Sequence, residues 1–233
     1  MGPDQREYRE RMGGPAECAT RAASLGHRAR VTTAERRELI SLSGNADARV
    51  RAIALSALVR VGPRRDATAV WRSAAQDRDT SVRRRAAELA PALGAEVPVR
   101  ALIALLADDD ALVAEAGAFA LGEHPRAGPQ ASVALTRAAT DHDDPLVREA
   151  AVAALGARGD AGTLPAVLRA CDDKPAVRRR AVLALAAFDG PEVEARLQRA
   201  LTDPDWQVRQ AAEDLLGDRA GDASVSSAGR SEP

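Results

Sequence analysis

The stretch that decides the fold is Asp144-Pro145-Leu146-Val147-Arg148-Glu149-Ala150-Ala151-Val152-Ala153-Ala154-Leu155-Gly156. Val147 and the apolar residues at i+3, i+4, i+7 and i+8 from it fall on one face of a helix. An aspartate precedes this run and a glycine follows it, and these residue types favour a helix start and a helix end. The stretch therefore predicts a helix whose small apolar side chains allow close packing against a neighbour.

The chain contains six copies of this stretch. Each copy has a valine at the position of Val147, called the anchor below, and the intervals between successive anchors are 30 to 34 residues long. A fixed period in this range indicates stacked supersecondary units. The anchors are Val50, Val82, Val113, Val147, Val177 and Val208.

A second, shorter helical pattern precedes each copy. Clear examples are residues 99–106 and 193–201, in which alanine, valine and leucine recur at helical spacing. Each unit is therefore expected to be a helix–turn–helix. One such pair cannot bury its apolar face alone, whereas a stack of six can.

The repeated strings follow the pattern D-x-x-V-R-x-x-A-x-x-A-L-G and extend roughly from Thr33 to Gly217. In this pattern they resemble the HEAT repeat, specifically the short bacterial HEAT-like repeats first associated with phycobilisome lyases. The resemblance implies an all-α fold, a right-handed α–α superhelix (solenoid) of about six HEAT-like helical hairpins. It implies no particular function, because many unrelated proteins use this repeat as a scaffold.

The composition along the chain predicts three segments. Residues 1–31 lack the anchor and are expected to form a partly disordered N-terminal cap, with short helices over 4–12 and 15–25. Residues 32–217 form the six repeats, and the polar residues 218–233 are expected to be a disordered tail. Within the repeats, glycine is expected to end each second helix in a left-handed conformation, at Gly62, Gly94, Gly122, Gly156, Gly190 and Gly217.

Acidic residues cluster before every anchor, and an arginine follows most anchors. The aspartates are expected to cap the second helices and to offset their dipoles. Asp144 and Arg148 also stand four residues apart, as do the equivalent residues of other repeats. Such a pair could close within one helix, or the arginine could bridge to the next repeat, and the spacing does not choose between these.

The overall charge favours no class of polyanionic partner. The formal net charge is −1 with 29% charged residues, and aromatic residues make up only 2%. The N-terminal residues contain no apolar run resembling a signal peptide, and no stretch reaches the ~20 apolar residues of a membrane span. We expect a cytoplasmic protein, of bacterial type by its repeats, that does not enter a membrane.

Motifs that carry chemistry are missing from the sequence. There is no nucleophile elbow, no phosphate-binding glycine loop and no dinucleotide fingerprint. The three histidines and the two cysteines, Cys18 and Cys171, form no spaced ligand set. The sequence therefore yields no catalytic residue, no metal ligand and no cofactor, and the protein is expected not to be an enzyme.

A partner is expected on the second helices, which line the concave face of HEAT-type solenoids. Side chains two, six and nine residues after each anchor point away from the apolar seam, and with their neighbours they alternate from basic to acidic to basic along the repeats. This surface either is a solvated face of mixed charge or reads a protein or peptide of complementary charge. The candidate partner-binding residues are Arg84, Arg85, Glu115, Phe119, Glu149, Arg179 and Arg180.

The third repeat is irregular, since Ala114 replaces the anchor arginine and Phe119 occupies an outward position. Phe119 either contacts a partner or packs against Val152 of the next repeat. A non-enzymatic interaction scaffold for an unidentified protein or peptide is the first functional hypothesis. A HEAT-like nucleic-acid-binding protein of the alkylpurine DNA glycosylase type, which the net charge disfavours, and a lyase-type enzyme subunit are the alternatives. The oligomeric state stays open.

Overall fold

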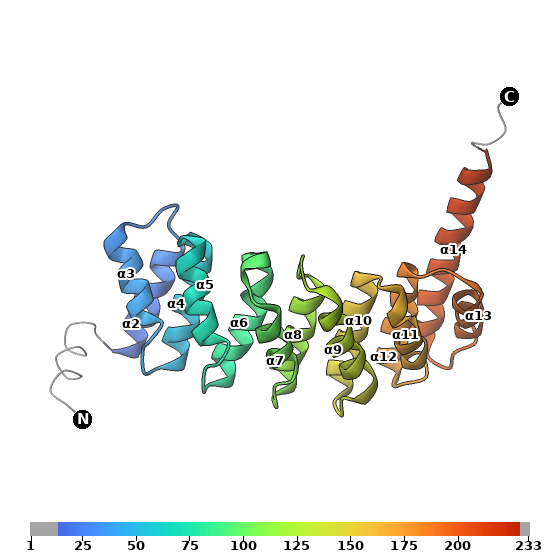
Figure 1. The fold of residues 1–233 in the computed structure, drawn as a ribbon, viewed down its shortest axis with the longest axis horizontal. Helices are drawn as coiled ribbons and strands as arrows, with labels where there is room; N and C mark the ends of the chain where they lie inside the picture. Colours follow the sequence, from blue (N-terminus) through green and yellow to red (C-terminus); the bar gives the residue numbers. More distant parts are fainter. Residues whose placement is uncertain (1–13, 229–233) are drawn as a thin grey trace. The chain divides into compact units, whose positions relative to one another are not determined.

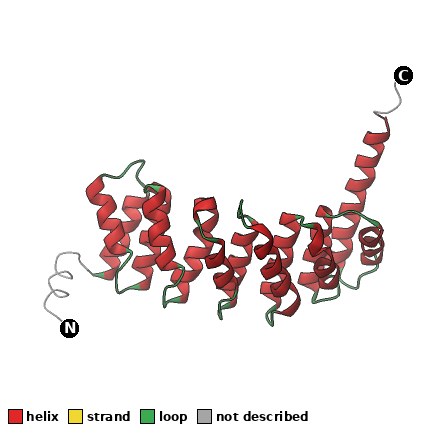
Figure 2. Ribbon diagram, viewed as in Figure 1, coloured by secondary structure: helices red, strands yellow, loops and turns green. Residues whose placement is uncertain are grey.

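The computed structural model describes residues 14–228 of the chain, with side chains described as far as Gly217. Every regular element in this range is a helix, and the range contains no β-strand (Figure 2). The all-α fold class is therefore confirmed. The helix expected over residues 4–12 lies outside the described residues.

Helices pair off along the chain as the repeats predict (Figure 1). Each pair has a first helix and a second helix, and the anchor valine lies in the second. A single helix, α2 (Pro15–Gly26), precedes the pairs, and the short 3₁₀ helices η1 (Gly94–Glu96), η2 (Ala161–Thr163) and η3 (Leu185–Ala187) lie in connections. The pairs in the described range are α3 (Thr33–Leu42) with α4 (Ala48–Val61), α5 (Arg64–Ala74) with α6 (Thr80–Leu93), α7 (Val99–Leu106) with α8 (Ala111–Gly122), α9 (Gly128–Asp141) with α10 (Pro145–Arg158), α11 (Leu164–Ala170) with α12 (Pro175–Ala184), and α13 (Pro191–Ala200) with α14 (Trp206–Ala228).

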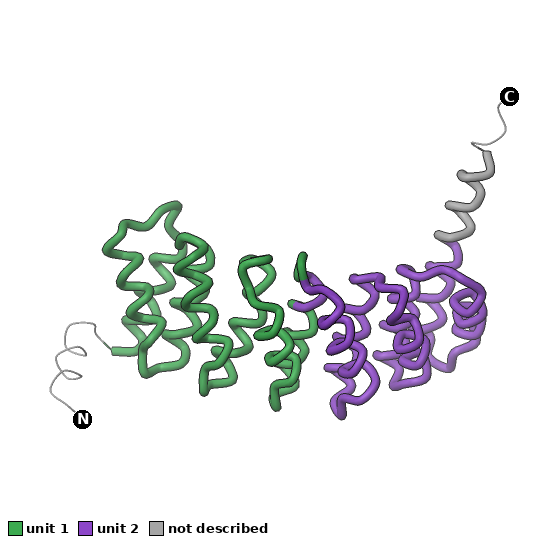
Figure 3. Tube along the Cα trace, viewed as in Figure 1, with its two compact units in different colours: residues 1–120, 124–126 green, residues 121–123, 127–233 purple. Residues whose placement is uncertain are grey.

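The helical pairs form two compact units (Figure 3). Unit 1 comprises residues 1–120 and 124–126, and unit 2 comprises residues 121–123 and 127–233. The first three repeats thus belong almost entirely to unit 1, and the last three belong to unit 2. The boundary between the two units therefore falls between the third and fourth repeats of the stretch expected over residues 32–217.

Second helices pack on one another within each unit. In unit 1, α2 packs on α4 and α4 packs on α6; in unit 2, α10 packs on α12 and α12 on α14. The six anchor valines are at most 1% exposed. Because small side chains such as alanine surround them, the helices approach closely and exclude water, which is the main stabilisation of such a stack. The seam of the solenoid is therefore where the repeat pattern places it.

The ends of the repeat array are helical. Helix α2 packs on α4 and buries Cys18, Ala22 and Leu25. At the other end α14 continues to Ala228, beyond the boundary at Asp218 where a disordered tail was expected to begin. No proline occurs after Pro204 until Pro233, and a single glycine weakens a helix by about 1 kcal/mol without stopping it. Residues 229–233 are not described.

The repeated glycines have two roles, and only one of them was expected. Gly94 and Gly190 adopt positive φ values of 59° and 121°. Gly156 instead lies inside α10, where a Cβ atom would stand 2.7 Å from the Cβ of Ala184. Gly122 is the last residue of α8 and has no positive φ, and a Cβ atom there would stand 2.9 Å from the Cβ of Ala154. The expected left-handed stop is wrong at these two positions, where glycine is needed because neighbouring second helices touch. It is also wrong at Gly62 and Gly217, whose φ values are not positive.

Aspartate caps begin most second helices, as expected. Asp47 accepts a hydrogen bond from the backbone N–H of Val50, and Asp144 accepts one from that of Leu146. The equivalent aspartates Asp79, Asp110 and Asp205 cap α6, α8 and α14 in the same way. These caps hold the loop before each second helix in a fixed conformation.

Candidate interaction surface

A series of arginine–aspartate pairs links consecutive repeats within each unit. The arginine directly after the anchor reaches an aspartate in the turn before the second helix of the next repeat and binds it through two parallel hydrogen bonds of 2.6 to 2.9 Å. We call these pairs the arginine ladder. Unit 1 contains Arg51–Asp77 and Arg83–Asp108, and unit 2 contains Arg148–Asp173 and Arg178–Asp203.

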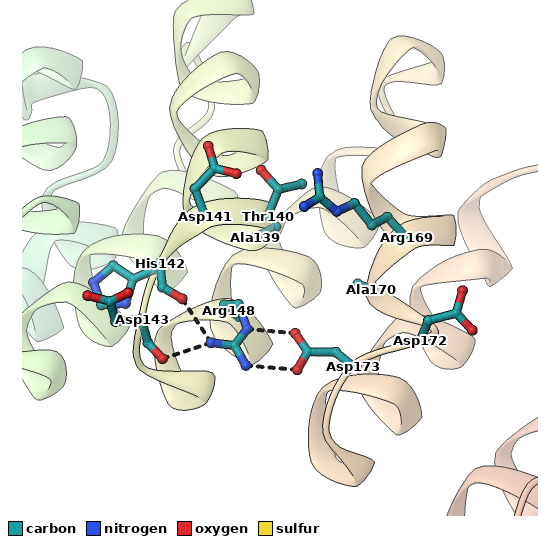
Figure 4. A pocket seen from close by; sticks show the side chains of 10 residues that line it. All are labelled: Ala139, Thr140, Asp141, His142, Asp143, Arg148, Arg169, Ala170, Asp172 and Asp173. Atoms are coloured by element: carbon teal, nitrogen blue, oxygen red, sulfur yellow. Dashed lines mark hydrogen bonds and ion pairs between the residues drawn. The ribbon is translucent and has the colours of Figure 1, made fainter.

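Arg148 shows how fully each ladder arginine is used (Figure 4). Its Nη1 donates to the carbonyl oxygens of His142 and Asp143, both at 2.8 Å, while Nε and Nη2 donate to Asp173. Asp144, four residues before Arg148, is occupied as the helix cap. Of the two arrangements that the spacing allowed, the bridge to the next repeat is therefore the one that forms.

The ladder changes the acidity of its aspartates. The hydrogen bonds from Arg148 lower the pKa of Asp173, although partial burial acts in the opposite direction. Arg83 lowers the pKa of Asp108, and Arg178 lowers that of Asp203, for the same reason. These carboxylates are ionised at neutral pH, and each accepts three hydrogen bonds from the protein, so their charge contributes to holding the repeats together.

Both halves of the ladder pair are replaced between the third and fourth repeats. Ala114 stands at the arginine position of the third repeat, and His142 stands at the aspartate position of the fourth. His142 keeps one function of the aspartate, since its Nδ1 accepts the backbone N–H of Asp144. It cannot supply the carboxylate. The two replacements fall on either side of the boundary between the units.

In unit 1 the candidate residues lie on α6 and α8. Arg84 Nε and Arg85 Nη1 each stand 2.9 Å from an oxygen of Glu88, so one carboxylate serves two guanidinium groups. Glu115 and Phe119 are four residues apart on α8 and share a face of that helix. Phe119 is 57% exposed.

In unit 2 the candidate residues of opposite charge come together. Glu149 on α10 lies 3.5 Å from Nη2 of Arg180 and 3.9 Å from Nη2 of Arg179, both on α12. The Nε atoms of the two arginines are buried without a hydrogen-bond partner in the described part of the chain. The expected alternation of basic and acidic zones therefore becomes a cluster here, in which one carboxylate is shared by two arginines.

Comparison with known proteins places this geometry in a family. The family model for HEAT repeats matches residues 36–122, 99–176 and 168–228, and together these segments cover most of the chain. The chain belongs to the HEAT-repeat family. Comparison with curated proteins gives no match.

Solved structures share the HEAT-repeat fold of this chain. YibA of Escherichia coli matches with a TM-score of 0.62 at 18% identity, over 91% of this chain and 85% of YibA. An engineered protein matches with a TM-score of 0.55 at 22% identity, over 78% of this chain and 95% of that protein. The structure of Kap95p bound to RanGDP gives 0.59 at 15% identity, over 93% of this chain and 31% of the matched chain. At these identities the likeness shows the fold alone.

Sequence reasoning missed two arginines on the second helices of this HEAT-repeat protein. Arg49 and Arg60 lie on α4 and are exposed, one residue before and ten residues after the anchor Val50. The rule based on positions two, six and nine omits both. A helical stripe through Arg49, Ile53, Ser56 and Arg60, spaced i, i+4, i+7 and i+11, would have identified them.

The tryptophans do not form a stacking surface for bases. Trp71 is fully buried and its indole N–H donates to the carbonyl of Ala86 at 2.6 Å, so it is a core residue. Trp206 is exposed and belongs to the other unit, at the start of α14. The HEAT-like glycosylases use tryptophan against the damaged base, and Trp71 cannot take that role.

The pocket around the ladder pair of Arg148 is acidic (Figure 4). It has a volume of about 460 Å³, and Asp141, Asp143 and Asp172 line it together with Arg169. Among the described residues no three His, Cys, Asp or Glu side chains converge as ligands for a metal ion. In the same part of the chain no helix is both long and apolar enough to cross a membrane.

Proposed function

We propose that the protein is a non-enzymatic scaffold that binds a protein or peptide on its second helices. HEAT repeats are a rigid framework on which exposed side chains can be held at fixed intervals. One protein of similar fold, Kap95p, binds the protein RanGDP. A cytoplasmic site of action, expected from the sequence, is part of this proposal.

The observation that carries the proposal is an apolar stripe on α8. Leu112 and Phe119 are 42% and 57% exposed, and they are seven residues apart on one helical face with Glu115 between them. On α12, Leu183 is also exposed and lies on the same side as Arg179 and Arg180. Large apolar side chains interleaved with arginine and glutamate are typical of surfaces that bind other proteins.

The mixed charge of these helices argues against nucleic acid as the partner. A phosphate backbone needs a continuous basic track. Glu115 on α8 and Glu149 on α10 introduce carboxylates, and Glu149 is already paired with arginines. Nothing in the described residues supports a lyase activity.

The test is quantitative capture from a native lysate of the source organism. Wild type is compared with a variant in which Arg84, Arg85, Arg179 and Arg180 are changed to Glu, and with Phe119→Ala. We expect a protein that is recovered with wild type and reduced at least about tenfold with both variants. Bound nucleic acid is measured in the same eluates.

A matched control carries the same change of charge on first helices. The exposed residues Arg72, Arg100, Arg137 and Arg199 are changed to Glu in one variant. If this control loses the captured protein to the same extent, binding follows total charge and the second helices are not the site. Recovery of nucleic acid alone, lost in the second-helix variant, would replace the proposal with the nucleic-acid alternative.

A further inference from the structure

A pocket lies on the second helices of unit 1, and of the candidate residues only Arg85 is among those that line it. Its volume is about 390 Å³, and it runs from the end of α2 across α4 to the start of α6. Between its charged residues the lining includes the small side chains of Ala23, Ala52 and Ala57, together with the larger Ile53. Short side chains leave room for an extended peptide backbone, which larger residues would occupy.

The charge lining the pocket has one sign. Arg49, Arg60 and Arg85 line it together with His27, whereas none of the lining residues is an aspartate or a glutamate. Arg60 is held in place because its Nη1 donates to the carbonyl oxygen of Gly26 at 3.3 Å. Arg85 shares Glu88 with Arg84, so that cluster keeps a net positive charge. The pocket is therefore complementary to carboxylates.

The distance between the charged ends limits the size of the ligand. Arg49 and Arg60 are eleven residues apart on one helix, which corresponds to about 16 Å along its axis. An extended peptide covers this distance in about five residues. A segment with a carboxylate near each end and small side chains between would meet an arginine at both ends of the pocket and alanine in the middle.

We propose that this pocket binds a short acidic peptide segment of a partner protein in an extended conformation. Nucleic acid fits less well, since no aromatic side chain lines the pocket for a base to stack on, and Glu88 lies beside its edge. The inference rests on the proposed scaffold function and specifies the chemistry of one segment that the scaffold recognises.

The experiment measures fluorescence anisotropy with the purified full chain and three labelled probes. The probes are the peptide Glu-Ala-Ala-Ala-Glu, its uncharged counterpart Gln-Ala-Ala-Ala-Gln, and a five-nucleotide oligothymidylate. We expect the acidic peptide to bind at least about tenfold more tightly than the other two probes, because only it pairs carboxylates with the arginines of the pocket. Raising the salt concentration should weaken its binding.

An arginine outside the pocket gives the control variant. Arg72 lies on the first helix α5, is exposed and does not line the pocket, whereas Arg85 lines it. Arg85→Glu should weaken the acidic peptide at least about tenfold, while Arg72→Glu should change its affinity less than about threefold. Ser56→Phe fills the pocket without changing charge and should also abolish binding; circular dichroism verifies that each variant is folded.

Three results would overturn the inference. They are no binding of the acidic peptide up to about 1 mM protein, equal losses with Arg72→Glu and Arg85→Glu, and tighter binding of the oligonucleotide than of the peptide. If the acidic peptide does not bind the pocket but capture from the lysate still depends on the second helices, the scaffold proposal stands and only the proposed peptide site is lost. If capture fails as well, both proposals fall.

Discussion

At the scale of single residues, the arginine ladder makes a testable contribution to stability. Arg148 and Asp173 have side chains that are only 14% and 19% exposed, and they form two hydrogen bonds. Asp173→Asn should lower the free energy of unfolding by about 1–3 kcal/mol, because it leaves a partly buried guanidinium without its carboxylate. Urea denaturation followed by circular dichroism measures this difference.

Asp172 supplies the control for this substitution. It is the preceding residue, its side chain is 61% exposed, and it accepts one hydrogen bond from Arg196, whose own side chain is 13% exposed. Asp172→Asn should change the free energy of unfolding by less than about 1 kcal/mol, because this carboxylate lies largely in water and takes one hydrogen bond from its arginine instead of two. Equal effects of the two substitutions would contradict a special role for the ladder.

The same pairs should make the protein sensitive to acid. The folded-state pKa values of Asp108, Asp173 and Asp203 lie below the ordinary value of 3.8, with the ladder arginines as the main cause. A lowered pKa stabilises the folded state above the ordinary value, and this stabilisation is lost as the pH falls below it. Unfolding free energy should therefore fall as the pH drops below the ordinary value of 3.8, and less steeply in Asp173→Asn than in wild type. Parallel profiles of the two proteins would rule out Asp173 as a contributor.

The residues of the ladder could be identified from the sequence, but their partners could not. Asp144 and Asp173 are both plausible acceptors for Arg148, one four residues before it and one 25 residues after it. Only the stacking of α10 on α12 decides between them, because it brings the second aspartate to the arginine. The replacement of the arginine by Ala114 was visible in the sequence as a break in the repeat. The matching replacement of the aspartate by His142 could be recognised only once the bonded pairs were known.

At the scale of elements, the close approach of second helices explains why glycine ends the repeated stretch in the fourth repeat. Gly156 on α10 faces Ala184 on α12. Gly156→Ala would bring two Cβ atoms within 2.7 Å, so the helices must separate, and we expect a loss of about 1–3 kcal/mol in stability. Thermal unfolding of the variant measures the loss.

Gly162 allows the opposite case to be measured in the same unit. A Cβ atom there would meet no heavy atom within 4 Å, and its φ is not positive. Gly162→Ala should leave the melting temperature within about 2 °C of wild type or raise it slightly, because the unfolded chain loses freedom. If Gly156→Ala is equally neutral, the helices have room that the observed packing does not show.

Helix positions followed from the sequence more reliably than helix ends. The anchor, the cap and the 3.6-residue period act locally, so each pair of helices could be placed before the fold was known. Ends depend on neighbours: Gly156 lies inside α10 instead of ending it, and α14 continues past Asp218. The outward direction of Arg84 and Phe119 was equally local, whereas the sharing of Glu149 by Arg179 and Arg180 required the packing of α10 on α12.

At the scale of the whole molecule, the division into two units predicts how a local defect spreads. Repeats are stabilised by their immediate neighbours, and every observed ladder pair lies inside one unit. Val147→Asp places an unpaired charge at a fully buried position of unit 2 and should cost about 3 kcal/mol or more. Hydrogen exchange should then show loss of protection in α10 and α12, while α4 and α6 keep theirs.

Val133→Asp is the matched substitution for this experiment, because Val133 lies on α9 of the same unit and is 70% exposed. It should leave protection in both units unchanged, since the new carboxylate stays in water. Loss of protection in α4 and α6 together with α10 and α12 would show that the chain unfolds as one cooperative body. Loss confined to unit 2 would mean that the two units unfold independently, although the repeat pattern continues through both of them. The boundary of cooperative unfolding would then fall in the part of the sequence where Ala114 and His142 replace the ladder pair.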